Sequence, residues 1–294
     1  MSKTTLFVVN PIAGGINKSF VTSKINSWAK SSNHSEKTWE TSGQNDLRKL
    51  KAHIEDIQPE CVVAIGGDGT LMLCAIALKN TGIPLGLIPA GSANGMASEL
   101  EIPENVDQAL QIIDKAHIME TDMLCFNDEH YGLHISDIGL NAKLVKNFEE
   151  SGRRGFLGYA EGIISELVHL EPFKVRLKLD DTSLEENCYM VAFANARRYG
   201  TGALLNYLGQ MNDGLFEVCI LRKFDLAGIA GQFLDMLDEE SEHLKVIQGK
   251  ELYLEMDEPH SFQIDGELQG SITKLHVKVI PACLKLIVPD QKKP

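Results

Sequence analysis

The chain has 294 residues, of which 44% are hydrophobic and 23% charged, a composition typical of a globular protein with a sizeable core. Its net charge of −13 argues against a nucleic-acid partner and against anchoring through a polybasic patch on anionic lipid. No segment carries the roughly 18 consecutive apolar residues that a membrane span needs, and the N-terminus lacks a signal-peptide pattern. We therefore expect a soluble, cytoplasmic protein. The six cysteines form no C-x-x-C pair and are expected to be buried thiols.

Strand and helix signals alternate over the first 125 residues. Short apolar runs with strand character lie at 6–10, 61–65 and 84–89, and segments with helical composition lie at 17–30, 70–79 and 93–100. Continuous apolar strands that alternate with helices predict a parallel sheet covered on both faces.

After about Asn127 the pattern changes to shorter strands, several of them with alternating polarity. The expected strands are 130–135, 173–179, 189–194, 215–221 and 252–256, interrupted by helical segments near 156–169 and 225–238. This pattern predicts a second, antiparallel and β-rich domain.

The sequence Gly66-Gly67-Asp68-Gly69-Thr70 follows a buried strand and opens a helix. Glycines let backbone N–H groups approach phosphate oxygens, and a helix N-terminus adds partial positive charge. The loop is neither a Walker A loop nor a dinucleotide G-x-G-x-x-G fingerprint. A tight turn would explain two glycines, but it does not require the acidic residue. Similar loops follow two other strands, at 10–15 and 89–95, and three such loops at the carboxyl ends of strands in one sheet predict a phosphate-binding edge.

Together these motifs resemble the diacylglycerol kinase catalytic domain, which diacylglycerol kinases share with sphingosine and ceramide kinases. The resemblance begins with Asn10-Pro11 and Gly14, the 66–70 loop, and Pro89-x-Gly91-Ser92-x-Asn94. It continues, in the family's order, through Gly155–Tyr159, Asn195-Ala196, Met211–Phe216 and Ile264–Glu267. The Gly-Gly-Asp-Gly element alone is shared with NAD kinases and phosphofructokinases, whereas the combination is specific to the diacylglycerol kinase family.

The resemblance implies two domains. The first is a Rossmann-like α/β domain of the NAD kinase and phosphofructokinase type, expected to bind the nucleotide and to cover residues 1–125, with 277–294 returning to it. The second is an antiparallel β-sandwich over residues 126–276, expected to take the lipid substrate.

The resemblance also implies the site residues. Glu267 matches the residue named as proton acceptor in the family, and Asp265 and Asp68 are the other candidate catalytic carboxylates. Magnesium would be held by backbone carbonyls and one carboxylate at Gln210, Asp213 and Leu215. The residues expected to bind ATP are Asn10, Thr41, Gly66, Gly67, Asp68, Gly69, Thr70, Leu71, Met72, Ser92 and Asn94.

Phosphoryl transfer needs an aligned γ-phosphate, neutralisation of its charge, and removal of the acceptor's proton. Asp68 could coordinate Mg²⁺ directly or through water. Asp265 and Glu267 lie two apart on an expected strand and would share one face, where one of them could act as base. The alternative for Asp265-Gly266 is a hairpin turn, because Asp-Gly is a strong turn signal. The histidines show no convincing metal-ligand spacing.

The sequence favours an ATP- and Mg²⁺-dependent lipid kinase that phosphorylates the hydroxyl of a lipid such as diacylglycerol or a sphingoid base, with transient contact with a membrane surface. A kinase for a soluble alcohol such as NAD, and a catalytically inactive nucleotide-binding regulatory protein, are the alternatives. Ser92 and Gly95 stand where many bacterial members of the family have Thr and Asp, which leaves the acceptor lipid open. The oligomeric state, including a homodimer, is also open.

Overall fold

The computed structural model of the protein describes residues 3–12, 18–32, 34–139, 171–199, 203–204, 206, 209–223 and 243–290. These residues form two compact units. The first contains the described residues up to Asp122 and those from Ala282 onward, and the second contains those from Met123 to Pro281. Strands β5 (His117–Phe126) and β16 (Glu267–Val288) each run from one unit into the other.

Some expected features lie outside the described residues. They are Gly14, the Gly155–Tyr159 motif and the helical segments expected near 156–169 and 225–238. Among the helices that the structure does describe, none is long and apolar enough to cross a membrane.

The first unit is built on a parallel sheet, as the sequence predicted. Its strands, in sheet order, are β2 (His34–Glu40), β1 (Lys3–Val9), β3 (Cys61–Gly66), β4 (Leu85–Pro89) and the end of β16. All residues of β3 and β4 are buried, because helices cover both faces of the sheet.

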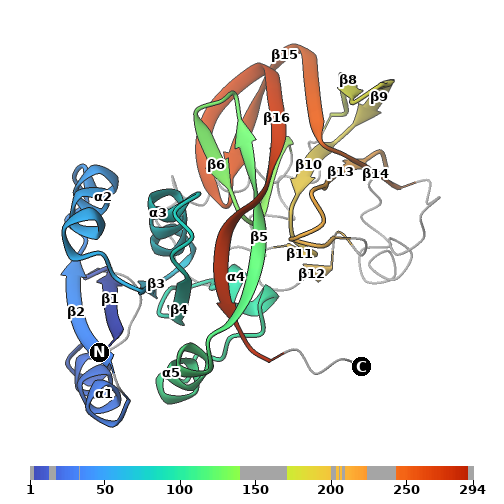
Figure 1. Cartoon of the computed structure of the whole chain (residues 1–294). Helices are drawn as coiled ribbons and strands as arrows, with labels where there is room; N and C mark the ends of the chain where they lie inside the picture. The colour runs from blue at the N-terminus through green and yellow to red at the C-terminus, as the bar shows by residue number, and fades with distance from the viewer. Residues whose placement is uncertain are drawn as a thin grey trace. The chain divides into compact units, whose positions relative to one another are not determined.

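Four of the helices that the structure describes cover this sheet. Helices α2 (Asp46–Ile57) and α3 (Asp68–Leu78) lie on one face, and α1 (Lys18–Ser31) and α5 (Val106–Lys115) lie on the other (Figure 1). A fifth, short helix, α4 (Gly95–Glu99), follows the loop after β4. The spacing of apolar residues explains how a helix covers the sheet: the buried residues of α5 are Val106, Ala109, Leu110 and Ile113, which fall on one helix face because positions three and four apart lie on the same side.

The second unit is an antiparallel sandwich, as expected. One ladder of strands runs β14 (Leu244–Gly249), β13 (Phe216–Leu221), β10 (Met190–Ala194), β7 (Ile135–Gly139), β15 (Glu251–Ile264) and β16. The other runs β9 (Thr182–Cys188), β8 (Phe173–Leu179), β15, β16, β5 and β6 (His130–Gly132). Apolar side chains from both ladders pack into one core cluster. Separately, β11 (Arg198–Tyr199) and β12 (Ala203–Leu204) form a two-stranded ribbon.

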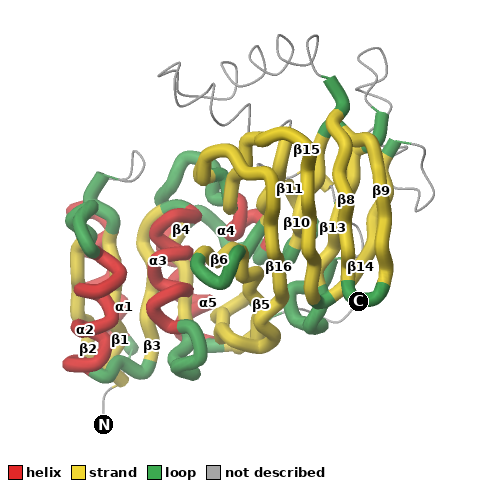
Figure 2. Tube along the Cα trace, turned by 90° about the horizontal axis from the view of Figure 1, so that it is seen from above, coloured by secondary structure: helices red, strands yellow, loops and turns green. Residues whose placement is uncertain are grey.

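Strands β15 and β16 belong to both ladders. The first half of β15 pairs with β8 and its second half pairs with β7. A register shift in the β15–β16 pairing between Glu255 and His260 separates the two halves, and Pro259 lies within it. Irregularities of this kind bend a strand, and proline is tolerated there because it cannot donate to the ladder. The long hairpin lies beside the other strands of the unit in Figure 2.

Two local predictions were wrong. The strand expected over 130–135 is interrupted at Leu133 and His134, so β6 and β7 are separate. Asp265 and Gly266 are not in a strand but form the turn between β15 and β16, with φ angles of 49° and 91°. Positive φ at both central positions is typical of the hairpin turn that Asp-Gly favours. Asp265 and Glu267 therefore do not share a strand face.

The six cysteines are buried and free, as the sequence predicted. Burial raises the pKa of the Cys61 and Cys188 thiols to about 12. A thiol with so high a pKa carries almost no thiolate at neutral pH, so these cysteines serve as packing residues.

Glu186 on β9 contacts two basic side chains, Arg222 and Lys245, and its contribution to the stability of the sandwich can be measured. It is 17% exposed, contacts Arg222 and accepts from Lys245 over 3.0 Å. Burial opposes its charged form, but hydrogen bonds from both cations outweigh burial and hold its pKa below the ordinary value of 4.5. The stabilisation that ionised Glu186 gives the folded protein is therefore fully present above pH 4.5, and it is lost as the pH falls through the lower pKa of the folded state.

We expect Glu186→Gln to lower the free energy of unfolding by about 1 kcal/mol at pH 7, with a smaller difference in acid. Urea denaturation at pH 7 and at successively lower pH measures it. Glu185→Gln is the matched control, because Glu185 is 55% exposed and should matter less. An equal loss at all pH values would show that the charge of Glu186 is not what stabilises.

Candidate functional site

The carboxyl ends of four neighbouring parallel strands meet at one edge of the first unit's sheet. The backbone N–H groups of Thr41, Asn10 and Ala90 each donate to a carbonyl of the adjacent strand end, over 2.9, 3.1 and 2.8 Å respectively. This edge therefore brings together the residues after β2, β1, β3 and β4. In open α/β sheets, ligands bind outside the carboxyl ends of the strands.

Two glycine loops at this edge are in backbone contact. A Cβ atom on Gly91 would lie 2.4 Å from the Cα of Gly67, and one on Gly66 would lie 2.3 Å from the Oγ1 of Thr70. Neither position can carry a side chain without movement of the backbone or of Thr70. Glycine at 91 is thus required by the approach of the two loops, and glycine at 66 by the side chain of Thr70 in its own loop.

Asp68 joins the same two loops. It is the first residue of α3, and its carboxylate accepts from the N–H groups of Gly95 over 3.0 Å and Met96 over 2.9 Å. These N–H groups belong to the first turn of α4. The first N–H groups of a helix have no acceptor within the helix, so the Asp68 carboxylate supplies one. Asp68 therefore fixes the loop after β4 against the loop after β3.

The side chain of Asn94 closes the loop after β4 on itself. Asn94 has a φ of 51°, accepts from the Gly91 N–H over 2.8 Å and donates to the Gly91 carbonyl over 3.1 Å. Ser92, between them, is exposed. Leu71 is only 1% exposed, so its side chain belongs to the core and its backbone alone could meet a ligand.

All the residues expected to bind ATP lie in the first unit, at this edge or in the start of α3: Asn10, Thr41, Gly66, Gly67, Asp68, Gly69, Thr70, Leu71, Met72, Ser92 and Asn94. The other expected site residues, which are Gln210, Asp213, Leu215, Asp265 and Glu267, lie in the second unit.

The turn that precedes Glu267 is fixed at two points. The Asp265 carboxylate accepts from the backbone N–H groups of Leu133 over 2.7 Å and His134 over 3.0 Å. Gln263 accepts from the Gly266 N–H over 2.6 Å and donates from its side-chain amide to the carboxylate of Asp137. Asp265 therefore stabilises the bend at 133–134, which explains why the chain leaves the strand conformation there.

Glu267 differs from the other two candidate catalytic carboxylates. It is exposed at the first position of β16, and no hydrogen bond or ion pair engages its carboxylate within the described parts of the chain. Asp68 and Asp265, by contrast, each accept two backbone N–H groups. Of the three candidates, Glu267 is therefore the one whose carboxylate does not already accept backbone hydrogen bonds.

The loop before β13 offers oxygen atoms rather than a cluster of acidic side chains. Asp213 is exposed, and one of its carboxylate oxygens accepts from the Leu215 N–H over 2.9 Å, which leaves the second oxygen available. Across the described ranges, no three His, Cys, Asp or Glu side chains group together. A cation here would rely on Asp213, backbone carbonyls such as those of Gln210 and Leu215, and water, all of which are ligands that Mg²⁺ accepts. The donor set therefore fits magnesium.

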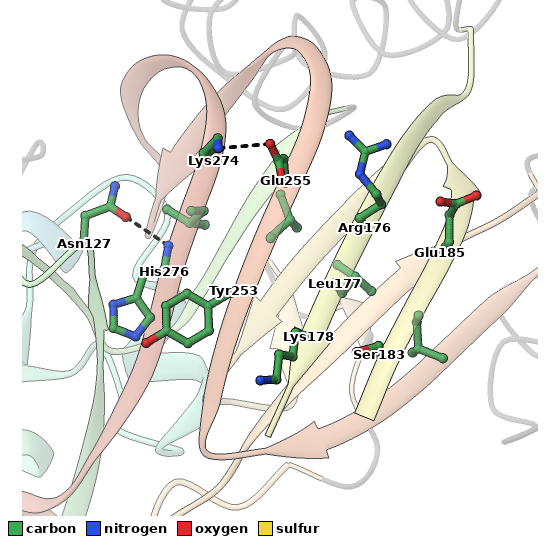
Figure 3. Close-up of a pocket in the computed structure, with 13 residues that line it drawn as sticks. Asn127, Arg176, Leu177, Lys178, Ser183, Glu185, Tyr253, Glu255, Lys274 and His276 are labelled. Atoms are coloured by element: carbon green, nitrogen blue, oxygen red, sulfur yellow. Dashed lines mark hydrogen bonds and ion pairs between the residues drawn. The ribbon is translucent and has the colours of Figure 1, made fainter. Parts of the chain in front are cut away.

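The exposed face of β8, β9, β15 and β16 carries a groove of about 720 Å³, shown in Figure 3. Tyr253 stacks on His276 there with ring centroids 4.4 Å apart, and ion pairs such as Lys274–Glu255, at 3.0 Å, neutralise the neighbouring charges. None of the expected site residues lines this groove. We therefore do not assign the groove to the chemistry.

Sequence reasoning missed Gln263 and Asp137 near the Asp265 turn, and it placed Asn195 in a family motif without giving it a structural role. Gln263 and Asp137 are at most 1% exposed, and Asn195 donates from its side chain to the Leu133 carbonyl over 2.9 Å. The available signal was the presence of amide and acidic side chains inside otherwise apolar strands. Buried polar groups need partners, so such residues indicate a network even when their partners cannot be named.

Two family models match the chain, one after the other. The diacylglycerol kinase catalytic domain matches residues 4–126, and the YegS C-terminal NAD kinase beta sandwich-like domain matches residues 135–288. A probable lipid kinase YegS of Salmonella arizonae is 28% identical over 270 residues, which are 87% of this chain and 86% of that protein. Its counterpart in Salmonella newport is 27% identical over the same shares.

Solved structures share the fold. A putative diacylglycerol kinase of Bacillus anthracis superposes with a TM-score of 0.79 and 21% identity, over 98% of each chain. A second diacylglycerol kinase structure from that organism gives a TM-score of 0.76 at 19% identity, over 98% of this chain and 97% of the other. The chain belongs to the diacylglycerol kinase family whose members join this catalytic domain to the YegS-type C-terminal domain, and it is an enzyme of the kinase class. The resemblance first seen in the motifs is confirmed.

The close approach of Gly67 and Gly91 allows a direct test of whether the two glycine loops form the nucleotide site. We expect Gly91→Ala to weaken nucleotide binding strongly, because the new Cβ would lie 2.4 Å from the Gly67 Cα and must push the two loops apart. Forcing one extra carbon into close contact costs about 1–3 kcal/mol, so stability should also fall. ATP binding by calorimetry and thermal unfolding measure the two effects. Ala93→Ser, an exposed change in the same loop, is the control; equal ATP affinity in both variants would contradict this account of the loop contact.

Proposed function

We propose that the protein is an ATP-dependent lipid kinase, which transfers the γ-phosphate of ATP to the hydroxyl of a lipid such as diacylglycerol or a sphingoid base. The observation that carries the proposal is the contact between the two glycine loops at the strand ends of the first unit, with Asp68 tying them together. The family match and the probable lipid kinases among its relatives support it.

The first unit supplies the nucleotide site in this proposal. Phosphoryl transfer depends on positioning and on neutralising the charge of the transferred group. Backbone N–H groups of the 66–70 loop and the start of α3 would hold the phosphates, and the exposed hydroxyl of Ser92 would add a further donor. Asn10 and Thr41, at the neighbouring strand ends, would contact the rest of the nucleotide.

The second unit supplies the acceptor and metal functions in this proposal. Glu267 would accept the proton of the lipid hydroxyl as the oxygen attacks the γ-phosphorus. Asp265 would act by positioning, because its carboxylate already accepts two backbone N–H groups. Mg²⁺ would be bound at Gln210, Asp213 and Leu215 and would supply positive charge, with water completing its coordination. The acceptor would be met through transient contact with a membrane surface.

The test is to incubate purified protein, Mg²⁺ and ATP labelled on its γ-phosphate with detergent-dispersed diacylglycerol, monoacylglycerol, sphingosine, ceramide or phosphatidylglycerol. NAD serves as the soluble acceptor. Label in one lipid would support the proposal and name the acceptor. Label in NAD alone would assign the chain to kinases for soluble alcohols. ATP binding without transfer to any acceptor would favour a nucleotide-binding regulatory protein.

A further inference from the structure

Two buried polar side chains near the Asp265 turn have no hydrogen-bonding partner among the residues that the structure describes. His134 is 9% exposed and Ser136 is 1% exposed, and the imidazole Nε2 and the hydroxyl Oγ are both buried without a partner in the described part of the chain. Most buried polar side-chain atoms in folded proteins do have a partner, so each exception calls for an explanation.

Both residues lie beside the turn that carries the proposed base. The Asp265 carboxylate holds the backbone N–H of His134 at 3.0 Å. The Ser136 hydroxyl also lies near this turn: a Cβ atom on Gly132 would be 3.2 Å from the Ser136 Oγ and 3.3 Å from an oxygen of Asp265. The Ser136 hydroxyl and the Asp265 carboxylate therefore both face the space that a side chain at position 132 would fill. Glu267 follows two residues after Asp265 at the start of β16.

The surrounding polar groups are used in a different way. Gln263 bonds to both Gly266 and Asp137, and the Asn195 side-chain amide donates to the Leu133 carbonyl. These bonds fix the backbone at the turn and at the bend. The side chains of His134 and Ser136 lie in the same region but make none of these bonds. A buried polar group without a partner lowers the stability of the free protein. Such groups are expected at functional sites, where a ligand can complete their hydrogen bonds.

We propose that His134 and Ser136 form the subsite for the polar headgroup of the acceptor lipid, which rests on the lipid kinase function proposed above. A serine hydroxyl both donates and accepts, and a neutral imidazole nitrogen does one or the other according to its tautomer. The pair therefore suits a headgroup that carries two neighbouring hydrogen-bonding groups. A glycerol hydroxyl with its adjacent ester meets this requirement, as does a sphingoid hydroxyl with its adjacent amine. The subsite orients the headgroup beside the proposed base.

The test compares His134→Leu and Ser136→Ala with wild type in steady-state assays, using diacylglycerol or sphingosine at varied mole fraction in detergent micelles. Each variant should raise the KM for the lipid about five- to tenfold, the value of one neutral hydrogen bond, and leave the KM for ATP unchanged. Comparing the two lipids shows which headgroup loses more. His130→Ala, an exposed change in β6, should leave both constants unchanged.

Thermal unfolding separates binding from structure. His134→Leu removes a buried polar group that lacks a partner and should keep or raise the unfolding temperature of the free protein. A lower unfolding temperature with an unchanged lipid KM in both variants would show that ordered water satisfies these groups, and would overturn the subsite alone. If the wild-type protein phosphorylates no lipid, the proposed function fails and the subsite fails with it. The wild-type assay thus distinguishes the two failures.

Discussion

Replacing Asp68 with alanine is expected to abolish phosphoryl transfer, with a loss of at least about 10²–10³-fold, the size seen when a preorganised polar group is removed from a reaction site. The structure gives the reason. The Asp68 carboxylate holds the N–H groups of Gly95 and Met96, so alanine releases the loop after β4 from the loop after β3. Steady-state transfer to the preferred lipid measures the loss.

The same change should lower the free energy of unfolding by about 1 kcal/mol, the usual cost of losing a side chain that caps a helix N-terminus. Asp68→Asn separates the two effects, because the amide oxygen can still accept one of the two N–H groups. It should regain much of the stability and little of the activity if the negative charge is needed for magnesium. Asp107→Asn, an exposed change on α5, is the control. Near-normal transfer by Asp68→Ala would contradict the proposed site.

Glu267→Gln is expected to lower kcat by about 10²–10⁴-fold, the contribution typical of a general base. ATP affinity should stay unchanged, because Glu267 lies outside the first unit, which carries the proposed nucleotide site. Stability should hardly change, since within the described residues the carboxylate engages no partner whose loss would matter. Turnover and ATP binding, measured on the same preparation, separate these effects.

Glu258→Gln is the matched control for Glu267→Gln, because it is an exposed carboxylate on the other strand of the same hairpin. An unchanged rate in Glu267→Gln would move the role of base to Asp265 or Asp68. Both of those carboxylates accept backbone N–H groups, so their substitution should reduce stability as well as turnover.

The first unit could be predicted from the sequence because its strands are short, continuous apolar runs bounded by glycine and proline. The run at 61–65 became β3, and the run at 84–89 became β4. The glycine loops could be placed at the strand ends for the same reason. Their mutual contact could not be predicted, because the approach of Gly67 to Gly91 depends on how adjacent strands are aligned in the sheet.

The second unit was harder to predict, because several of its features depend on contacts between distant residues. The bend at Leu133 and His134 is stabilised by Asp265, more than a hundred residues away in the chain. The halves of β15 pair with different strands, which alternation within one strand cannot reveal. Asp265-Gly266 carried a turn signal, and that local signal was correct where the extended-strand interpretation was wrong.

The roles of the two aspartates show the same limit. Family resemblance marks Asp68 and Asp265 as candidate catalytic residues, but it says nothing about what their carboxylates contact. The structure shows each one accepting two backbone N–H groups, which distinguishes them from Glu267. We therefore expect the aspartates to organise loops and Glu267 to carry the proton.

The most direct test of the account is the transfer of labelled γ-phosphate from ATP to a lipid, measured side by side for the wild-type protein and Asp68→Ala in the presence of Mg²⁺. We predict label in the lipid with wild type, matched by an equal amount of ADP, and little of either with the variant. Equal labelling by both proteins, or label in NAD and in no lipid, would contradict the proposed lipid kinase site.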